Sequence, residues 1–139
     1  MRYKIHWHVF LTHFPISFFV SAFLFQILHL FWYPDCFELA TNVSLVVGAI
    51  TMVPAMWTGW RTWRQNYKGA HVVLFQKKIA IAFALLGLSI SLAIWRAVYL
   101  GIFSAVPHGL NHWFYLSGNI LLIAGAAAEG LYGGLLNHH

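Results

Sequence analysis

The sequence predicts an all-α integral membrane protein: a four-helix bundle whose helices run alternately up and down through a bilayer. Hydrophobic residues make up 60% of the 139-residue chain and charged residues only 8%, whereas roughly 25% of the residues of a soluble globular protein are charged. Four apolar runs each reach the length of about 20 residues that a helix needs to cross the hydrocarbon core. Residues 1–139 are therefore expected to form a single domain of four transmembrane helices, with membrane lipid as its solvent.

The four spans are predicted at about residues 9–33, 39–60, 71–103 and 112–136. The first apolar run is too long for the apolar region of a signal peptide, so it is expected to be retained as a transmembrane helix. It stops at Pro34, and the second span, in which Pro54 predicts a kink, stops before the basic stretch 61–69. A turn that contains Pro107 separates the third span from the fourth. Connections this short predict that helices adjacent in sequence pack antiparallel.

Charged residues divide between the two sides of the predicted bundle. Four spans bring both termini to one side, which holds every basic residue but Arg96, namely Arg2, Lys4, Arg61, Arg64, Lys68, Lys77 and Lys78. The loops of the other side hold Asp35 and Glu38 and no lysine or arginine. Because basic loops stay in the cytoplasm, the topology is predicted to be N-in and C-in. The basic residues lie beside the ends of apolar runs and line no helix face, so the net charge of +5 predicts no nucleic-acid partner.

Histidines near the ends of the spans are the first candidates for function. They form a cytoplasmic group (His6, His8, His13, His71, His138 and His139) and an outer group (His29, His108 and His112). An imidazole in an apolar helix is costly unless something binds it, so intramembrane histidines indicate functional sites. Facing imidazoles on neighbouring membrane helices are what a b-type haem uses as axial ligands. The chain has no CxxCH sequence, so haem b is expected to bind non-covalently.

Alternating helix directions pair these histidines by depth. His13 and His71 share the cytoplasmic side and are predicted to ligate the iron of an inner haem. His29 and His112 share the outer side and are predicted to ligate a second haem. Along an ideal helix, His13 and His29 lie about 24 Å apart and about 160° apart around the axis, so two haems need separate grooves. One haem or two is compatible with this pattern, and the substitute ligands are His8 and His108.

Two charged residues lie inside the predicted spans, where each is costly unless it is paired. Arg96, at roughly the depth of His29, is predicted to bind a haem propionate through charge-assisted hydrogen bonds. Glu129, at roughly the depth of His13, is predicted either to orient a ligand histidine or to belong to a proton path. In the alternative interpretation, Arg96 extends to the outer headgroups, Glu129 is neutral, and the histidines are interfacial anchors.

Short motifs lie at the ends of several spans. They are His8-x4-His13-Phe14-Pro15, Gly59-Trp60, His71, Arg96 and Gly130-x-x-Gly133-Gly134-x-Leu136. This pattern resembles, over nearly the whole chain, the bacterial membrane proteins of domain of unknown function family 2231. Val9 replaces the family's usual proline, and Arg61-Thr62 replaces its usual acidic residue. The resemblance implies the bacterial inner (cytoplasmic) membrane, with His8, His13 and His71 as family positions. Because members are fused to c-type cytochrome or Rieske-type domains, it also implies membrane electron transfer.

These observations predict a membrane b-type cytochrome that transfers electrons between a partner redox subunit and the quinone pool, or across the membrane. The lone cysteine, Cys36, excludes an internal disulfide, a CxxC redox pair and a cysteine-ligated iron–sulfur cluster, so a partner in a homo- or hetero-oligomer is expected to supply the other redox centre. The chain is then an electron-transfer subunit of an oxidoreductase rather than an enzyme alone. The alternatives are a non-haem metal or proton transport protein and a purely structural membrane subunit.

Overall fold

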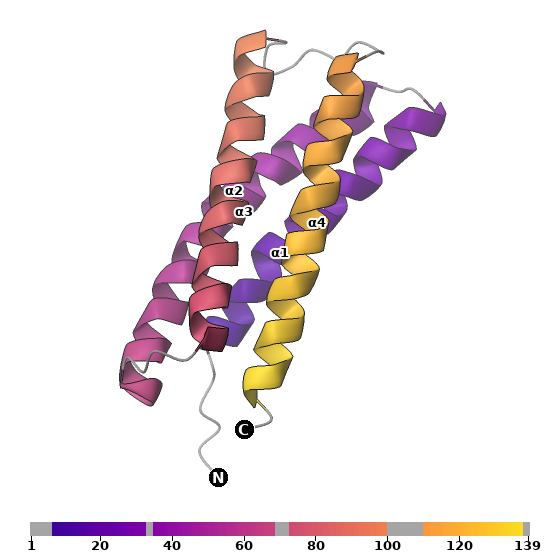
Figure 1. The fold of residues 1–139 in the computed structure, drawn as a ribbon. Helices are drawn as coiled ribbons and strands as arrows, with labels where there is room; N and C mark the ends of the chain where they lie inside the picture. The colour runs from indigo at the N-terminus through magenta and orange to yellow at the C-terminus, as the bar shows by residue number, and fades with distance from the viewer. Residues whose placement is uncertain (1–6, 33–34, 69–72, 100–109, 138–139) are drawn as a thin grey trace.

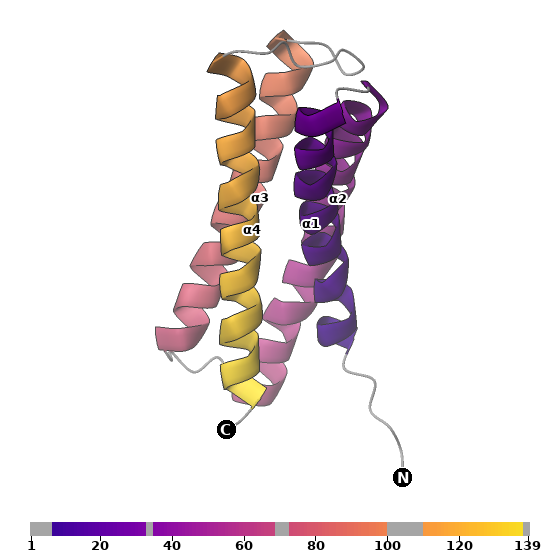
Figure 2. The ribbon, with the colours of Figure 1, turned by 90° about the vertical axis from the view of Figure 1, so that its right-hand side faces the viewer.

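Four α-helices make up the part of the chain that the computed structural model describes, residues 7–32, 35–68, 73–99 and 110–137 (Figure 1). They are α1 (Trp7–Trp32), α2 (Asp35–Tyr67), α3 (Val73–Tyr99) and α4 (Leu110–Asn137). Consecutive helices run in opposite directions (Figure 2), and none of the described residues belongs to a strand. The predicted all-α, up-and-down four-helix bundle is confirmed.

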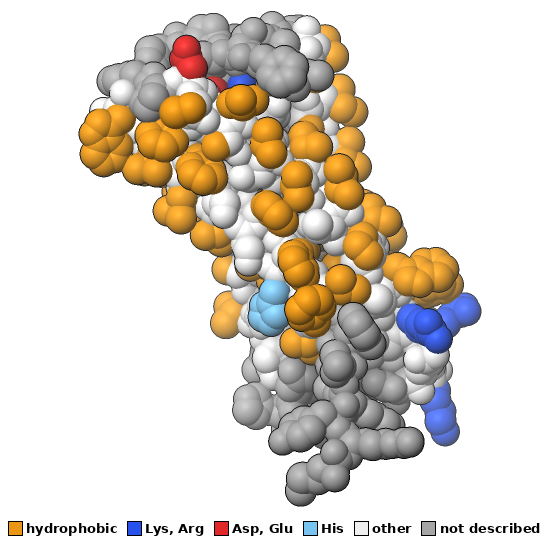
Figure 3. All heavy atoms as spheres, turned by 180° about the vertical axis from the view of Figure 1, so that it is seen from behind, with side chains coloured by type: hydrophobic (Ala, Val, Ile, Leu, Met, Phe, Trp, Pro, Cys, Tyr) orange, Lys and Arg blue, Asp and Glu red, His pale blue; other side chains and the backbone are white. Residues whose placement is uncertain are grey.

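The surface of the bundle is that of a membrane protein. All four helices are long and apolar enough to cross a bilayer, and hydrophobic side chains cover the flank that Figure 3 shows. The large hydrophobic side chains that are exposed include Phe83 on α3 and Leu131 on α4. Trp32 and Trp113 are exposed near helix ends, where tryptophan rings prefer the boundary between lipid and water. These features support a multi-pass membrane protein whose flank contacts lipid.

The two ends of the bundle differ in charge, and we name them accordingly. The basic end comprises the starts of α1 and α3 and the ends of α2 and α4, with Arg61, Arg64, Lys68, Lys77 and Lys78. The acidic end comprises the opposite helix ends, with Asp35 and Glu38 in the first turn of α2. Lysine and arginine side chains gather at the lower end of the view in Figure 3, and an acidic side chain is visible at its upper end.

Several helix boundaries differ from the predicted spans. Helix α2 begins at Asp35 rather than near Leu39, so Glu38 belongs to a helix and not to a loop. Acidic residues in a first turn are favoured there by the helix dipole. Helix α2 also continues through the stretch predicted to connect spans two and three and ends at Tyr67, where Lys68 adopts a left-handed conformation with a φ of 50°. Hydropathy marks only the part of a helix that lies in hydrocarbon, so it misses such polar extensions.

The middle of the bundle is apolar and tightly packed. Buried side chains from all four helices form one cluster: Phe19, Leu45, Met52, Leu85, Leu92, Tyr115 and Leu122. Two leucines of α3 pack directly against glycines of α4. A Cβ on Gly118 would lie 2.6 Å from Leu92 Cδ2, and a Cβ on Gly125 would lie 2.4 Å from Leu85 Cδ2, so neither position has room for a side chain. Small residues let membrane helices approach closely in this way.

Candidate functional site

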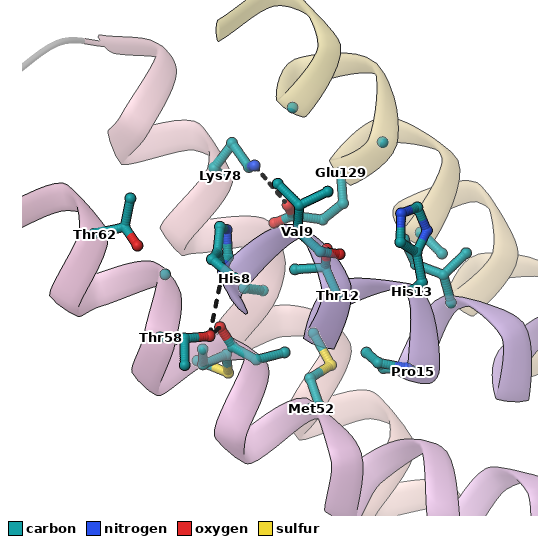
Figure 4. Close-up of a pocket in the computed structure, with 18 of the residues that line it drawn as sticks. His8, Val9, Thr12, His13, Pro15, Met52, Thr58, Thr62, Lys78 and Glu129 are labelled. Carbon is teal, nitrogen blue, oxygen red and sulfur yellow. Dashed lines mark hydrogen bonds and ion pairs between the residues drawn. The ribbon is translucent and has the colours of Figure 1, made fainter. Parts of the chain in front are cut away.

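A cavity of about 890 Å³ lies among the four helices in the half of the bundle nearest the basic end (Figure 4). Every helix contributes to its wall, with His8 and His13 from α1, Thr58 and Gly59 from α2, Lys78 from α3, and Glu129 from α4. Deeper in the bundle the wall is apolar and includes Phe19, Met52 and Leu85. The cavity thus combines a few polar groups with an apolar floor, the usual make-up of a ligand or cofactor site.

The orientation of the His8 ring follows from its contact with Thr58. His8 Nδ1 lies 3.4 Å from Thr58 Oγ1, and that hydroxyl also contacts the backbone carbonyl oxygens of Pro54 at 2.9 Å and Ala55 at 3.0 Å. A hydroxyl has one proton, and when either carbonyl accepts that proton, Thr58 Oγ1 accepts a hydrogen bond from His8 Nδ1–H. In that tautomer the lone pair is on His8 Nε2, the atom that binds a metal when the other ring nitrogen is hydrogen-bonded.

Gly59 makes room for this histidine. A Cβ on Gly59 would lie 2.7 Å from His8 Cε1, closer than non-bonded atoms approach, and a tight 3.2 Å from His8 Nδ1. Gly130 lines the same cavity, yet a Cβ there would have nothing within 4 Å. The two glycines therefore differ in what a methyl group would meet.

We expect Gly59→Ala to displace the His8 ring from Thr58 and to lower the free energy of unfolding by about 1–3 kcal/mol, the usual cost of overpacking. Gly130→Ala is the matched control and is expected to be neutral or slightly stabilising, because alanine favours a helix over glycine by about 1 kcal/mol. Unfolding in mixed micelles, followed by helical circular dichroism, measures both. Equal stability of the two variants would show that His8 does not pack against Gly59.

Glu129 and Lys78 form an ion pair across the cavity from α4 to α3. Lys78 Nζ lies 3.6 Å from Glu129 Oε2, and the two side chains are 18% and 17% exposed. Glu129 Oε1 is buried and has no hydrogen-bond partner among the described residues. Figure 4 shows this pair close to His8. The acid proposed from sequence for a proton path or for ligand orientation thus lies in the cavity beside a histidine and carries an unused acceptor.

The other predicted ligands are distributed as follows. His13 lines the cavity, and its side chain is exposed. His71 and His108 lie outside the described residues, and His112 belongs to α4 but its side chain is not described. His29 is buried near the acidic end, far along α1 from the cavity. Among the residues that the structure describes, no three histidine, cysteine or acidic side chains group closely enough to hold a metal ion; bis-histidine haem ligation requires only two.

A second set of polar side chains is buried towards the acidic end, and we call it the polar layer: Gln26, Glu38, Arg96, Tyr115 and Asn119. Arg96, predicted to bind a haem propionate, forms an ion pair with Glu38, and both side chains are 1% exposed. Asn119 Nδ2 donates to Gln26 Oε1 at 2.6 Å, and Arg96 Cζ lies 5.6 Å from the centre of the Tyr115 ring.

Sequence reasoning missed Glu38, Gln26 and Asn119, because it assigned Glu38 to a loop and did not consider the two amides. A usable signal was present: alternating helix directions put Glu38, early in α2, at the depth of Arg96, late in α3. Opposite charges at one depth inside a membrane are expected to pair.

The motifs that suggested a family converge in space. His8, His13 and Pro15 from the first motif, Gly59 from the second, and Gly130, Gly133 and Gly134 from the last all line the cavity. No family model, curated protein or solved structure matches the chain. The resemblance to domain of unknown function family 2231 therefore stays a prediction that rests on these motifs.

Proposed function

We propose that this protein is a membrane haem b protein that passes electrons between a redox partner and the quinone pool, with the haem held in the cavity at the basic end. The observation that carries the proposal is the His8 ring, whose Nδ1 lies 3.4 Å from Thr58 Oγ1, on the wall of a large intramembrane cavity. His8, the substitute ligand of the sequence prediction, is thereby the first ligand of the proposed site.

The residues present fit a haem. The cavity of about 890 Å³ falls within the roughly 300–1,000 Å³ typical of cofactor and ligand sites. Its floor is apolar, as the macrocycle requires, and Arg61 on its wall provides a cation for a propionate near the basic end. The second axial ligand is proposed to be His71, as the depth pairing predicts, or His13.

Bis-histidine ligation leaves no open iron position, which suits electron transfer rather than oxygen chemistry. A bound haem would supply a one-electron couple. Thr58 would orient the imidazole of His8 toward the iron. The apolar side chains of the cavity floor would exclude water. Glu129 is near enough to the site to contribute its carboxylate to the local charge.

The proposal is for one haem. His29 and Arg96 are themselves only 3% and 1% exposed, and Arg96 already binds Glu38. Transport of a metal or of protons is less well supported, since a mainly apolar layer with Ala22, Leu92 and Leu122 separates the cavity from the polar layer. By the positive-inside rule, we assign the basic end to the cytoplasmic face of the bacterial inner membrane.

The protein purified in detergent from cells supplied with ample haem precursor is expected to show sharp α and Soret bands after reduction with dithionite. The haem should be extracted by acidified acetone, because no covalent attachment sequence exists. Quantitation should return one haem per chain. A purified, folded protein with neither band would reject the cytochrome proposal and leave a structural or transport role.

A further inference from the structure

Two hydrogen-bonded pairs cross the bundle within the polar layer. Gln26 of α1 pairs with Asn119 of α4, and Glu38 of α2 pairs with Arg96 of α3. All four residues are at most 1% exposed, and each belongs to a helix that is long enough to span a membrane. Every helix thus contributes at least one polar side chain to a layer that is closed to the outside.

The pairs do not use the full hydrogen-bonding capacity of their side chains. Three atoms, Gln26 Nε2, Glu38 Oε2 and Asn119 Oδ1, are buried and have no hydrogen-bond partner within the described part of the chain. Buried polar atoms in native proteins are nearly always satisfied, either by the protein or by ordered water. Leaving three such atoms unpaired in a layer of low dielectric is costly.

Tyr115 connects the two pairs. Its backbone carbonyl accepts a hydrogen bond from Asn119 Nδ2 at 3.2 Å, and its ring lies 5.6 Å from Arg96 Cζ. Both pairs therefore lie around one aromatic side chain, itself 0% exposed. The Tyr115 hydroxyl is also buried without a hydrogen-bond partner among the described residues, so the two pairs and this hydroxyl surround one ring.

The chemistry of these atoms defines which kind of ligand the polar layer can bind. The amide pair leaves one donor and one acceptor whichever way the two amides are assigned, and Glu38 adds a second acceptor. A ligand must therefore both donate and accept hydrogen bonds. It must be small, because the surrounding side chains are almost wholly buried. It must be neutral, because the carboxylate of Glu38 is already balanced by Arg96.

We infer that the polar layer is an internal water site in which bound water pairs with Gln26, Glu38 and Asn119. A buried water usually makes two to four hydrogen bonds to protein groups, and these atoms supply three. This inference is independent of the proposed haem, since the apolar residues Leu92 and Leu122 lie between the polar layer and the cavity.

Radiolytic hydroxyl-radical labelling of the purified full-length protein, read by mass spectrometry, tests this inference because bound water activated in place labels buried neighbours. Tyr115 is expected to be modified severalfold faster than Leu122, after correction for the intrinsic reactivity of each side chain. Both residues are on α4 and both are 0% exposed, so burial alone predicts equal protection. Equal corrected rates would overturn the inference.

A pair of variants then identifies the atoms that hold the water. Gln26→Leu/Asn119→Leu removes both amides at similar volume and is expected to reduce the labelling of Tyr115 to the rate of Leu122. Thr41→Val is the matched control, because Thr41 is also 0% exposed but its hydroxyl donates to the Phe37 carbonyl of its own helix; its labelling should stay at the wild-type level. Undiminished labelling of Tyr115 in the double variant would contradict the proposal that the two amides hold the water. If the double variant does not fold, the comparison of Tyr115 with Leu122 in the wild type tests the inference.

Discussion

Replacing Arg96 with leucine is expected to lower the free energy of unfolding by about 3–5 kcal/mol, because it leaves the carboxylate of Glu38 buried without its counter-charge. Both side chains of the pair are 1% exposed, so bulk water does not solvate the abandoned carboxylate in the folded state. Either the polar layer would have to admit further water, or the carboxylate of Glu38 would have to take up a proton. Equilibrium unfolding in mixed micelles, with helical circular dichroism as the signal, measures the loss.

Two further variants separate the charge effect from a packing effect. Glu38→Met/Arg96→Met removes both charges at similar volume and is expected to recover most of the stability, since replacing a whole buried ion pair with apolar residues is often neutral. Lys77→Met removes a cation from an exposed position of the same helix and is expected to stay within about 0.5 kcal/mol of the wild type. An Arg96→Leu variant as stable as Lys77→Met would mean that the ion pair is not buried as described.

If haem is bound as proposed, replacing His8 with alanine is expected to remove at least half of it, or to convert the remainder to a high-spin form, because the proposed site then lacks an axial ligand. The reduced absorption spectrum, normalised to protein, measures this. Thr58→Val retains His8 but removes the oxygen 3.4 Å from its Nδ1. It is expected to weaken haem binding about 10- to 100-fold, the usual effect of losing a partner that orients a ligand.

A His8→Gly variant distinguishes ligation from folding. Free imidazole is expected to restore its low-spin spectrum, since the ligand can then enter the space that the side chain leaves. Val9→Ala, on the exposed neighbouring residue, controls for a general loss of stability at the start of α1. A wild-type spectrum in His8→Ala would exclude His8 as a ligand, and the same measurement on His13→Ala and His71→Ala assigns the second one.

Much of the architecture is determined locally and was therefore predictable. A helix that crosses lipid must satisfy its own backbone and present about 20 apolar residues, so four apolar runs predict four spans whatever their packing. Helix ends were less predictable, because polar stretches such as 61–65 remain helical after they leave the hydrocarbon. The presence of costly residues in the spans, Arg96 and Glu129 among them, was also evident from sequence.

What only the tertiary structure decided is which of those residues meet. The partner of a side chain depends on how each helix is rotated about its axis and on how closely the backbones approach, and both follow from packing rather than from local periodicity. Arg96 meets Glu38 and Glu129 meets Lys78 because alternating helices bring opposite charges to one depth and rotation turns them inward. His8 meets Thr58 rather than solvent because Gly59 has no side chain at the contact. The sequence by itself determined a membrane bundle with costly residues in its spans, whereas the packing of four helices divided those residues between a cavity and a closed polar layer.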